Sequence, residues 1–289
     1  MLDYLKLMDE IGISDSEREL FCALEAKRTD PAFEAAIAEG RRAFREGNES
    51  FEAFILNFAD REGLEPERIQ LYLTLLYSDT PYEKFRSRGM DDSVFYEMMK
   101  DVTDKCEANL TVGGIYGLPV PEIPWFRYHL SGILFRLGRF QYQIAKSEYD
   151  LELDGYRISK GDTCFFVHVP GGEPLVPEVC ERSYREAQSF FKQYFGADVM
   201  FCFCYSWLLQ PWLADVLSES SNIMRFSRTY RLIETIESIP HTFRFIFPKQ
   251  HDCLDDYPTD NPLRREAISR RRRGEPVGYG VGVRLLANL

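Results

Sequence analysis

The first half of the chain spaces its hydrophobic residues as amphipathic helices do. The clearest face follows Asn48 and consists of Phe51, Phe54, Ile55 and Phe58, at steps of three and four residues. Asp30 and Pro31 form a helix start, because aspartate caps free N–H groups and proline fits the first helical position. Similar faces recur as far as Val102. The pattern predicts about five or six helices packed as one bundle.

Past Trp125 the hydrophobic period shortens, and strands become the expected elements. The elements expected here are a short helix over Trp125–Leu137, strands over Arg139–Ser147, Tyr156–Ile158, Cys164–Val169 and Val199–Trp207, a helix over Val176–Phe195, a short helix over Leu208–Leu217, strands over Asn222–Arg228 and Phe243–Phe247, a helix over Pro262–Arg273 and a last strand over Val281–Leu286. The predicted fold class is therefore α/β (α+β overall), with an all-helical N-terminal domain followed by a mixed β-sheet domain with flanking helices.

Two of these strands are apolar along nearly their whole length. Cys164–Val169 and Val199–Trp207 are joined by the predicted helix over Val176–Phe195. Apolar strands connected through a helix are typical of parallel neighbours that are buried on both faces. Ligands of such sheets bind at the carboxyl ends of the strands, so we expect the functional edge near residues 170 and 207.

A stretch rich in glycine and proline, TVGGIYGLPVPEIP, separates the helical half from the rest. Residues 1–124 hold 14 Lys and Arg against 26 Asp and Glu, whereas residues 125–289 hold 21 against 20. We therefore expect two domains, 1–124 and 125–289, and an anionic ligand would favour the second.

Composition excludes several functional classes. A formal net charge of −11 over 289 residues argues against general nucleic-acid binding. The uncharged run Val199–Ala214 is too short for a membrane span of about 20 residues. The acidic start MLDYLKLMDE lacks the order of a signal peptide, and the 7 cysteines are odd in number and scattered. These features predict a cytoplasmic protein with reduced thiols that binds neither membrane nor nucleic acid, and they leave its oligomeric state open.

The first apolar strand ends in a group of residues that could carry chemistry. His168 is the only polar side chain in CFFVHV, and imidazole suits general acid–base work near neutral pH. Gly171 and Gly172 follow, and a glycine loop before a helix can present N–H groups to phosphates. The structural alternatives are a core histidine with a hydrogen-bond partner and an ordinary turn between strand and helix.

The second apolar strand divides its residues between two faces. Cys202, Cys204 and Ser206 share one face, and Tyr205 and Trp207 lie on the other. The spacing of the two cysteines fits no zinc pattern, so small residues packed under the helix are the favoured interpretation.

Three more conspicuous motifs are assigned to structure. The Arg270–Arg273 run predicts a solvated helix face, and His251-Asp252-Cys253 a polar loop. Gly278-Tyr-Gly280-Val-Gly282 stands too close to the chain end for a dinucleotide fold. The sequence has no Walker loop, no His-Glu-x-x-His and no Gly-x-Ser-x-Gly, which disfavours nucleotide kinases, zinc proteases and serine hydrolases.

Three blocks of sequence resemble a known family. They are Leu134-Phe135-Arg136-Leu137-Gly138-Arg139-Phe140-Gln141-Tyr142, Val167-His168-Val169-Pro170 with Gly172 and Leu175, and Cys204-Tyr205-Ser206-Trp207-Leu208-Leu209. Together with Trp125 and the Ser221–Phe226 stretch they look like the bacterial two-domain acyltransferase-like proteins. In those proteins a helical N-terminal domain precedes a GNAT-like C-terminal domain.

The resemblance implies a site at the ends of the two apolar strands. GNAT folds bind acyl-coenzyme A where two parallel strands diverge, which would place the cofactor along Val169, Pro170, Gly171, Gly172 and Leu175. Either acyl-CoA or acetyl-CoA would be the co-substrate, and no metal is implied. The superfamily's Arg/Gln-x-x-Gly-x-Gly/Ala loop is absent here, and Gly171-Gly172-Glu173-Pro174 stands in its place.

Three functional hypotheses follow from these features. The leading one is transfer of an acyl group from a CoA thioester to the amine of a small molecule or peptide. Its base would be His168 or Glu173, and its acid Tyr205 or Ser206. The second is a GNAT-like module that binds a ligand or partner without catalysis. The third is an unrelated hydrolase or thiol enzyme that uses Cys204 and His168.

Overall fold

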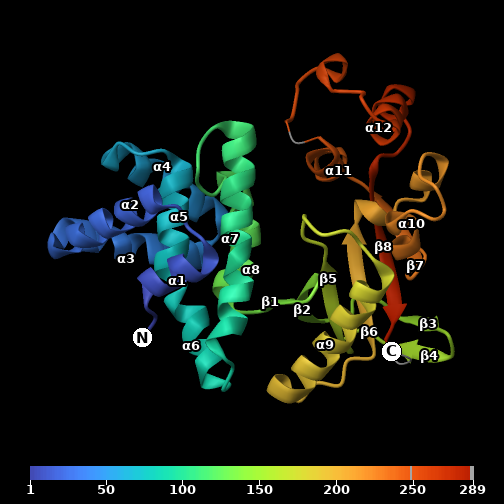
Figure 1. Cartoon of the computed structure of the whole chain (residues 1–289), viewed down its shortest axis with the longest axis horizontal. Coiled ribbons are helices and arrows are strands. Elements are labelled where there is room, and N and C mark those ends of the chain that lie inside the picture. Colours follow the sequence, from blue (N-terminus) through green and yellow to red (C-terminus); the bar gives the residue numbers. More distant parts are fainter. Residues whose placement is uncertain (248, 287–289) are drawn as a thin grey trace. The chain divides into compact units, whose positions relative to one another are not determined.

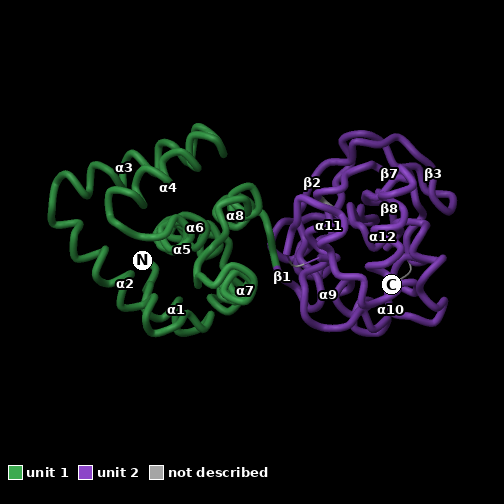
Figure 2. Tube along the Cα trace, turned by 90° about the horizontal axis from the view of Figure 1, so that it is seen from above, with its two compact units in different colours: residues 1–135 green, residues 136–289 purple. Residues whose placement is uncertain are grey.

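The computed structural model describes residues 1–247 and 249–286 of the chain, which Figure 1 shows as ribbons. The chain forms two compact units, Met1–Phe135 and Arg136–Leu289, coloured separately in Figure 2. The first unit is helical, and the second is built on a β-sheet with helices (Figure 1). The predicted order of a helical part followed by a mixed α/β part is confirmed.

The helical unit is fully described, and its helices are mostly short. They are α1 (Tyr4–Ile11), α2 (Asp15–Ala26), α3 (Pro31–Glu46), α4 (Asn48–Glu62), α5 (Pro66–Tyr77), α6 (Asp79–Ser87), α7 (Asp92–Gly113) and α8 (Ile123–Ser131), with 3₁₀ turns η1 (Lys27–Thr29) and η2 (Val120–Glu122). Helix α5 is buried at every position from Ile69 to Tyr77, so it forms the centre of the bundle. The unit has more helices than the five or six expected before the linker, since α1 and α6 are only about two turns long. Helix α8 corresponds to the first part of the short helix expected over Trp125–Leu137.

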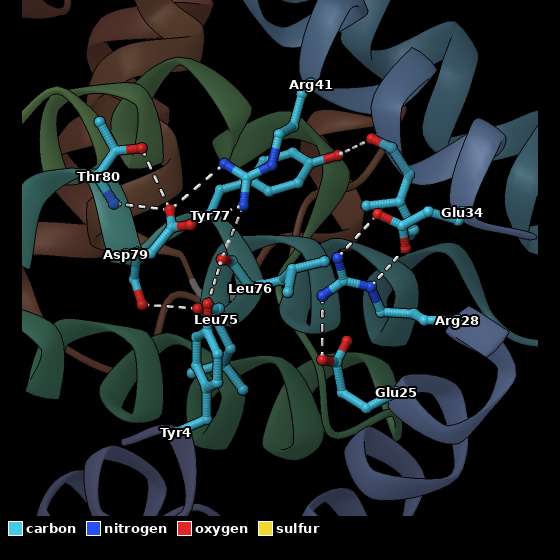
Figure 3. Close-up of polar contacts among 12 residues, drawn as sticks. Tyr4, Glu25, Arg28, Glu34, Arg41, Leu75, Leu76, Tyr77, Asp79 and Thr80 are labelled. Carbon is cyan, nitrogen blue, oxygen red and sulfur yellow. Dashed lines mark hydrogen bonds and ion pairs between the residues drawn. The ribbon is translucent and has the colours of Figure 1, made fainter. Parts of the chain in front are cut away.

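A set of ion pairs and hydrogen bonds joins α1, α3, α5 and α6 (Figure 3). Arg41 of α3 donates to both carboxylate oxygens of Asp79, at 3.3 and 2.9 Å, and to the carbonyl oxygen of Leu76. Arg28 donates to the two oxygens of Glu34, at 2.6 and 2.9 Å. All four charged side chains are partly exposed, so we expect these ion pairs to contribute little to the free energy of unfolding. Their main effect is on how neighbouring segments are positioned.

A buried polar group links α7 to α8 in the same unit. Asp101 accepts the indole N–H of Trp125 at 2.6 Å, and its Oδ2 lies 3.3 Å from Nε2 of His129. Both Asp101 and His129 are buried. Burial alone would raise the pKa of Asp101, but the contacts with His129 and Trp125 outweigh it and hold this pKa well below its usual range.

The second unit is organised around six strands in the order β1-β2-β5-β6-β8-β7. These strands are β1 (Leu134–Leu137), β2 (Phe140–Lys146), β5 (Thr163–His168), β6 (Phe201–Ser206), β7 (Arg231–Glu237) and β8 (Gly278–Leu285). The β5–β6 pair is parallel, while β2–β5, β6–β8 and β7–β8 are antiparallel. The prediction that the two apolar strands are parallel neighbours is confirmed.

Each face of this sheet has its own cover. Helix α9 (Pro177–Phe195) packs on one face of the sheet (Figure 1). There the ring of Phe191 lies 4.7 Å from that of Phe165. A hairpin of β3 (Leu151–Leu153) and β4 (Tyr156–Ile158) packs on the other face, in a cluster with Cys164 and Phe203. The predicted strand over Tyr156–Ile158 is confirmed as β4, and the predicted helix over Val176–Phe195 is confirmed as α9.

Several other sequence predictions were wrong. Residues 134–137 form strand β1 and not the end of a helix, because Gly132 ends α8 in a left-handed conformation. Asn222–Arg228 and Phe243–Phe247 were expected as strands. Asn222–Ser227 forms helix α10, capped by the Ser221 side chain, and Ile239–Ile246 forms helix α11. Short apolar runs do not distinguish a buried strand from a buried helix.

The remaining elements follow or modify the prediction. Two 3₁₀ turns, η3 (Trp207–Leu209) and η4 (Pro211–Asp215), replace the short helix expected there. Strand β7 had no hydrophobic signal, because it is an edge strand exposed at most of its positions. A 3₁₀ turn η5 (Leu254–Asp256) precedes helix α12 (Pro262–Arg273), and both α12 and the last strand agree with the prediction.

The glycines of β8 have a packing role. A Cβ added at Gly280 would lie 2.8 Å from the Cβ of Leu209, and one at Gly282 would lie 2.7 Å from its Cδ1. These glycines let the η3 turn lie directly on β8. The GYGVG motif therefore belongs to the sheet, in line with its rejection as a dinucleotide loop.

Candidate active site

The two parallel strands β5 and β6 separate at their carboxyl ends. Within the described part of the chain, the β5–β6 ladder covers only the pairs Phe165–Cys202 and Phe166–Phe203. Beyond it, Val167 and His168 pair with β2, while residues 204–206 pair with β8. Each strand thus continues beside its outer neighbour. We call the place where the two strands are no longer paired, between residues 167–170 and 204–206, the slot.

His168 and Tyr205 lie on the hairpin face of the sheet at this slot. They alternate with Val167 and Cys204, and the ring of Tyr205 is 5.3 Å from that of Phe166, two residues before His168. His168 is half-buried, and its Nε2 lies 3.4 Å from Oε1 of Gln143. The structure therefore brings a candidate base and a candidate acid to the same face of the slot.

The environment of Tyr205 favours its protonated form. The side chain is half-buried, and burial raises the pKa of its phenol, an effect that contact with the Tyr149 hydroxyl partly opposes. Tyr149 itself donates a 2.7 Å hydrogen bond to Glu234 of β7. A phenol that keeps its proton at neutral pH can donate it to a leaving group.

Ser206 is on the opposite face and has a structural partner. Its Oγ accepts the backbone N–H of Leu208 at 3.2 Å, and its side chain is buried. This bond caps the η3 turn, so Ser206 helps to turn the chain away from the slot.

The loop after β5 places the other predicted residues in different environments. Val169 and Pro170 are half-buried, Gly171, Gly172 and Glu173 are exposed, and Leu175 is buried. Gly172 has φ +95°, a conformation that a side chain disfavours. Helix α9 then begins at Pro177 with no side chain capping it. The loop therefore holds exposed backbone at the mouth of the slot, next to a helix N-terminus.

The cysteines of β6 are ordinary core residues. Cys204 is 1% exposed, and burial raises the pKa of its thiol well above the usual value. It shares the α9 face with Cys202, whereas His168 lies on the hairpin face. A thiolate nucleophile needs an exposed and electropositive setting, which Cys204 lacks.

Sequence reasoning missed the polar residues that β2 contributes. The antiparallel register places Gln141 opposite His168, and Gln143 is the neighbour that contacts it. Arg139 lies just before β2 and donates to the carbonyl oxygen of Pro170 at 2.9 Å. The alternation over Arg139–Ser147 placed these three residues on one face, but only the strand register shows that this face adjoins β5.

Two grooves lie away from the slot. One of about 340 Å³ runs between α3 and α4, with Arg42 and Arg61 in its lining. Another of about 340 Å³ lies near the amino ends of β5 and β6, beside Thr163 and Met200. Neither is lined by the predicted site residues.

Two family models match the sequence on either side of the junction between the units. One, described as an N-acyltransferase N-terminal domain, matches residues 3–132, and the other, a GNAT-like C-terminal domain, matches residues 134–284. The chain belongs to this family of two-domain acyltransferase-like proteins. The resemblance seen in the three sequence blocks is confirmed, and so is the GNAT-like character of the sheet domain.

Solved structures of several acyltransferases have the same fold as this chain. An acyltransferase in complex with decanoyl-CoA and teicoplanin has a TM-score of 0.76 and 22% identity, over 97% of this chain and 87% of that one. A mutant acyltransferase in complex with octanoyl-CoA has a TM-score of 0.76 and 21% identity, over 97% of this chain and 86% of that one. An acyltransferase in complex with CoA and 10C-teicoplanin has a TM-score of 0.68 and 20% identity, over 99% of this chain and 100% of that one. None of the curated proteins matches the sequence.

The described part of this two-domain acyltransferase-like chain contains neither a candidate membrane span nor a candidate metal site. No helix in residues 1–247 and 249–286 is both long and apolar enough to cross a membrane. Over the same residues, no group of three or more His, Cys, Asp or Glu side chains is arranged to hold a metal ion.

Proposed function

We propose that this protein is an acyl-CoA-dependent N-acyltransferase. The observation that carries the proposal is the slot, where β5 and β6 separate after Phe166 and Phe203 and expose His168 and Tyr205 at the opening. Membership in a family whose N-terminal domain is described by N-acyl transfer supports it, as do neighbours solved with acyl-CoA.

The slot and the loop beside it fit a long thioester arm. The arm would lie along the backbone of His168–Pro170, which is no longer paired with β6, and the buried Leu175 would line the apolar part of the arm. Its phosphates would lie near Gly171 and Gly172, where the backbone is exposed beside the free start of α9. A bound acyl-CoA supplies an activated acyl carbon with a thiolate leaving group.

Acid and base roles follow from the two side chains on the hairpin face. His168 accepts a proton from the incoming ammonium, with the exposed Glu173 as the less favoured alternative. The amine nitrogen then bonds to the acyl carbon, the carbon–sulfur bond breaks, and Tyr205 gives its proton to sulfur. The second proton, which the nitrogen loses on becoming an amide, restores the Tyr205 phenol. Backbone N–H groups at the slot polarise the carbonyl. Ser206 is the weaker candidate acid, because its hydroxyl already caps a turn.

The acceptor we propose is an amine on a small molecule or a peptide-like compound. Two of the solved neighbours are complexes with teicoplanin or 10C-teicoplanin, which supports an acceptor of that kind. A cytoplasmic, bacterial setting is part of the proposal, because CoA thioesters and seven unpaired cysteines both fit a reducing compartment.

Binding of a CoA thioester tests the function without knowledge of the acceptor. Octanoyl-CoA at 100 times its dissociation constant should stabilise the native protein by about 2.7 kcal/mol, because it binds only the folded chain. A thermal-shift series with acetyl-, octanoyl- and decanoyl-CoA measures this effect, with adenosine triphosphate as a control. A melting temperature that no CoA compound changes at millimolar concentration would contradict the proposal and favour a GNAT-like module without acyl transfer.

A second prediction separates this mechanism from a thiol enzyme. Cys204→Ala should leave the turnover number within about twofold of the parent, since the thiol is buried on the α9 face of the sheet, opposite the face that carries His168 and Tyr205. It should cost about 1 kcal/mol of stability through lost packing. Steady-state kinetics with a CoA thioester and any amine that the parent acylates provide the measurement. Loss of activity in a variant that still binds CoA would instead support a covalent route through Cys204.

A further inference from the structure

Arg139 is a buried cation that lacks a carboxylate partner. Its side chain is only 7% exposed, and its Nε is enclosed without a hydrogen bond. One terminal nitrogen donates to the carbonyl oxygen of Pro170, and the guanidinium carbon lies 5.9 Å from the ring centre of Phe140. No carboxylate of the described residues lies within ion-pair distance of it. Burying a guanidinium in this way is unfavourable, and burial lowers its pKa.

The position of Arg139 ties it to the loop at the mouth of the slot. Pro170 is the last residue before Gly171 and Gly172, and its carbonyl oxygen accepts from Arg139. Burial lowers the pKa of Arg139, and Cys180 in the first turn of α9 and the exposed Glu173 partly oppose this effect. The start of α9 has no side-chain cap. A buried guanidinium with one unsatisfied nitrogen thus lies beside the exposed Gly171–Glu173 loop at a helix N-terminus, and such a region attracts anions.

The local charge makes a cation necessary for an anion to bind there. Glu173 and Glu178 are exposed on either side of the uncapped helix start, and both would repel a phosphate. Arg139 comes from the β1–β2 turn and reaches the Gly171–Glu173 loop through the carbonyl oxygen of Pro170.

Resting on the proposed function, we propose that Arg139 binds the phosphate nearest the pantetheine arm and so selects donors that carry a 4′-phosphopantetheine group. A guanidinium suits this task because it offers several donors in a plane to the phosphate oxygens. CoA and shorter 4′-phosphopantetheine compounds share this chemistry, whereas unphosphorylated pantetheine lacks it.

Calorimetric binding of three ligands to the full chain tests the inference. The ligands are CoA, 4′-phosphopantetheine and pantetheine, and the variants are Arg139→Gln, Arg139→Lys and Arg185→Gln, the last an exposed arginine of α9 as a control. Arg139→Gln should weaken binding of the two phosphorylated ligands by about 10- to 100-fold, and that of pantetheine by less than about twofold. Arg139→Lys should fall between Arg139→Gln and the parent, and Arg185→Gln should match the parent.

Each other outcome decides against the inference in a different way. An equal loss for all three ligands would make Arg139 a purely structural support for Pro170, and no loss would remove it from the site. If Arg139→Gln does not fold, the parent must still prefer 4′-phosphopantetheine to pantetheine, and equal affinities would overturn the inference. A parent that binds pantetheine and CoA equally well keeps the proposed function but not the role of Arg139, whereas a parent that binds neither loses both.

Discussion

Replacing His168 by alanine should lower the turnover number by about 100-fold or more, while the Michaelis constant for the CoA thioester changes little. General base catalysis contributes about 10²- to 10⁴-fold, and the imidazole is the base that we place at the slot. Its side chain contacts Gln143 and does not reach into the α9 core, so alanine there removes chemistry more than packing. Steady-state kinetics at saturating amine measure both constants.

The pH profile separates a base from a merely structural histidine. The parent should lose kcat toward acid pH as its base becomes protonated, and His168→Ala should lack this limb. His251→Ala is a matched control, because His251 is also half-buried but lies in the loop beside Tyr257. Equal turnover in parent and His168→Ala would identify His168 as a core residue and would leave Glu173 as the base to test.

The largest stability effect should come from Asp101 in the helical unit. Asp101→Ala leaves the buried His129 imidazole and the indole N–H of Trp125 without their acceptor, which should cost about 3 kcal/mol. Asp101→Asn should cost less, because its amide oxygen still accepts from Trp125. Urea unfolding followed by circular dichroism at neutral pH gives these differences. Asp104→Ala, an exposed position one turn along, should cost under about 1 kcal/mol.

The contribution of Asp101 also depends on pH with a definite sign. Its pKa in the folded chain is depressed below the unfolded value of about 3.9. The stability that it provides is therefore fully present above that value and is lost as the pH falls through the folded pKa. The difference in unfolding free energy between the parent and Asp101→Ala should therefore shrink as the pH falls below about 3.9. A difference that does not shrink below that pH would contradict this assignment.

The sequence was most informative where packing demands are strong. Strands β5 and β6 are buried on both faces, so their apolar runs predicted the parallel pair and the edge where it opens. Helix α9 has one apolar face and was equally clear. Exposed and short elements were the difficult ones: β7 buries little of its surface, and α10 has only six residues.

The candidate site could be predicted only in part. His168, Tyr205 and the glycine loop are each adjacent to a strand end in the sequence, so their positions followed from the strands themselves. Arg139 reaches the same edge from the β1–β2 turn and Gln143 from β2, and Arg139 meets Pro170 across 31 positions of chain. Their roles depend on strand register, which local sequence does not specify.

The way the slot is held open has a consequence for changing donor preference. β5 is anchored by β2, and β6 by β8, whose glycines admit Leu209. The slot is thus held open by the pairing of each strand with its outer neighbour, and no side chain inside it is needed to keep β5 and β6 apart. Under the proposed function Leu175 lines the path of the acyl-CoA arm, so exchanging it for a bulkier or smaller residue should change which acyl donors are accepted while the strands keep their places. A side chain at Gly280, well outside the slot, would disturb the scaffold for every donor alike.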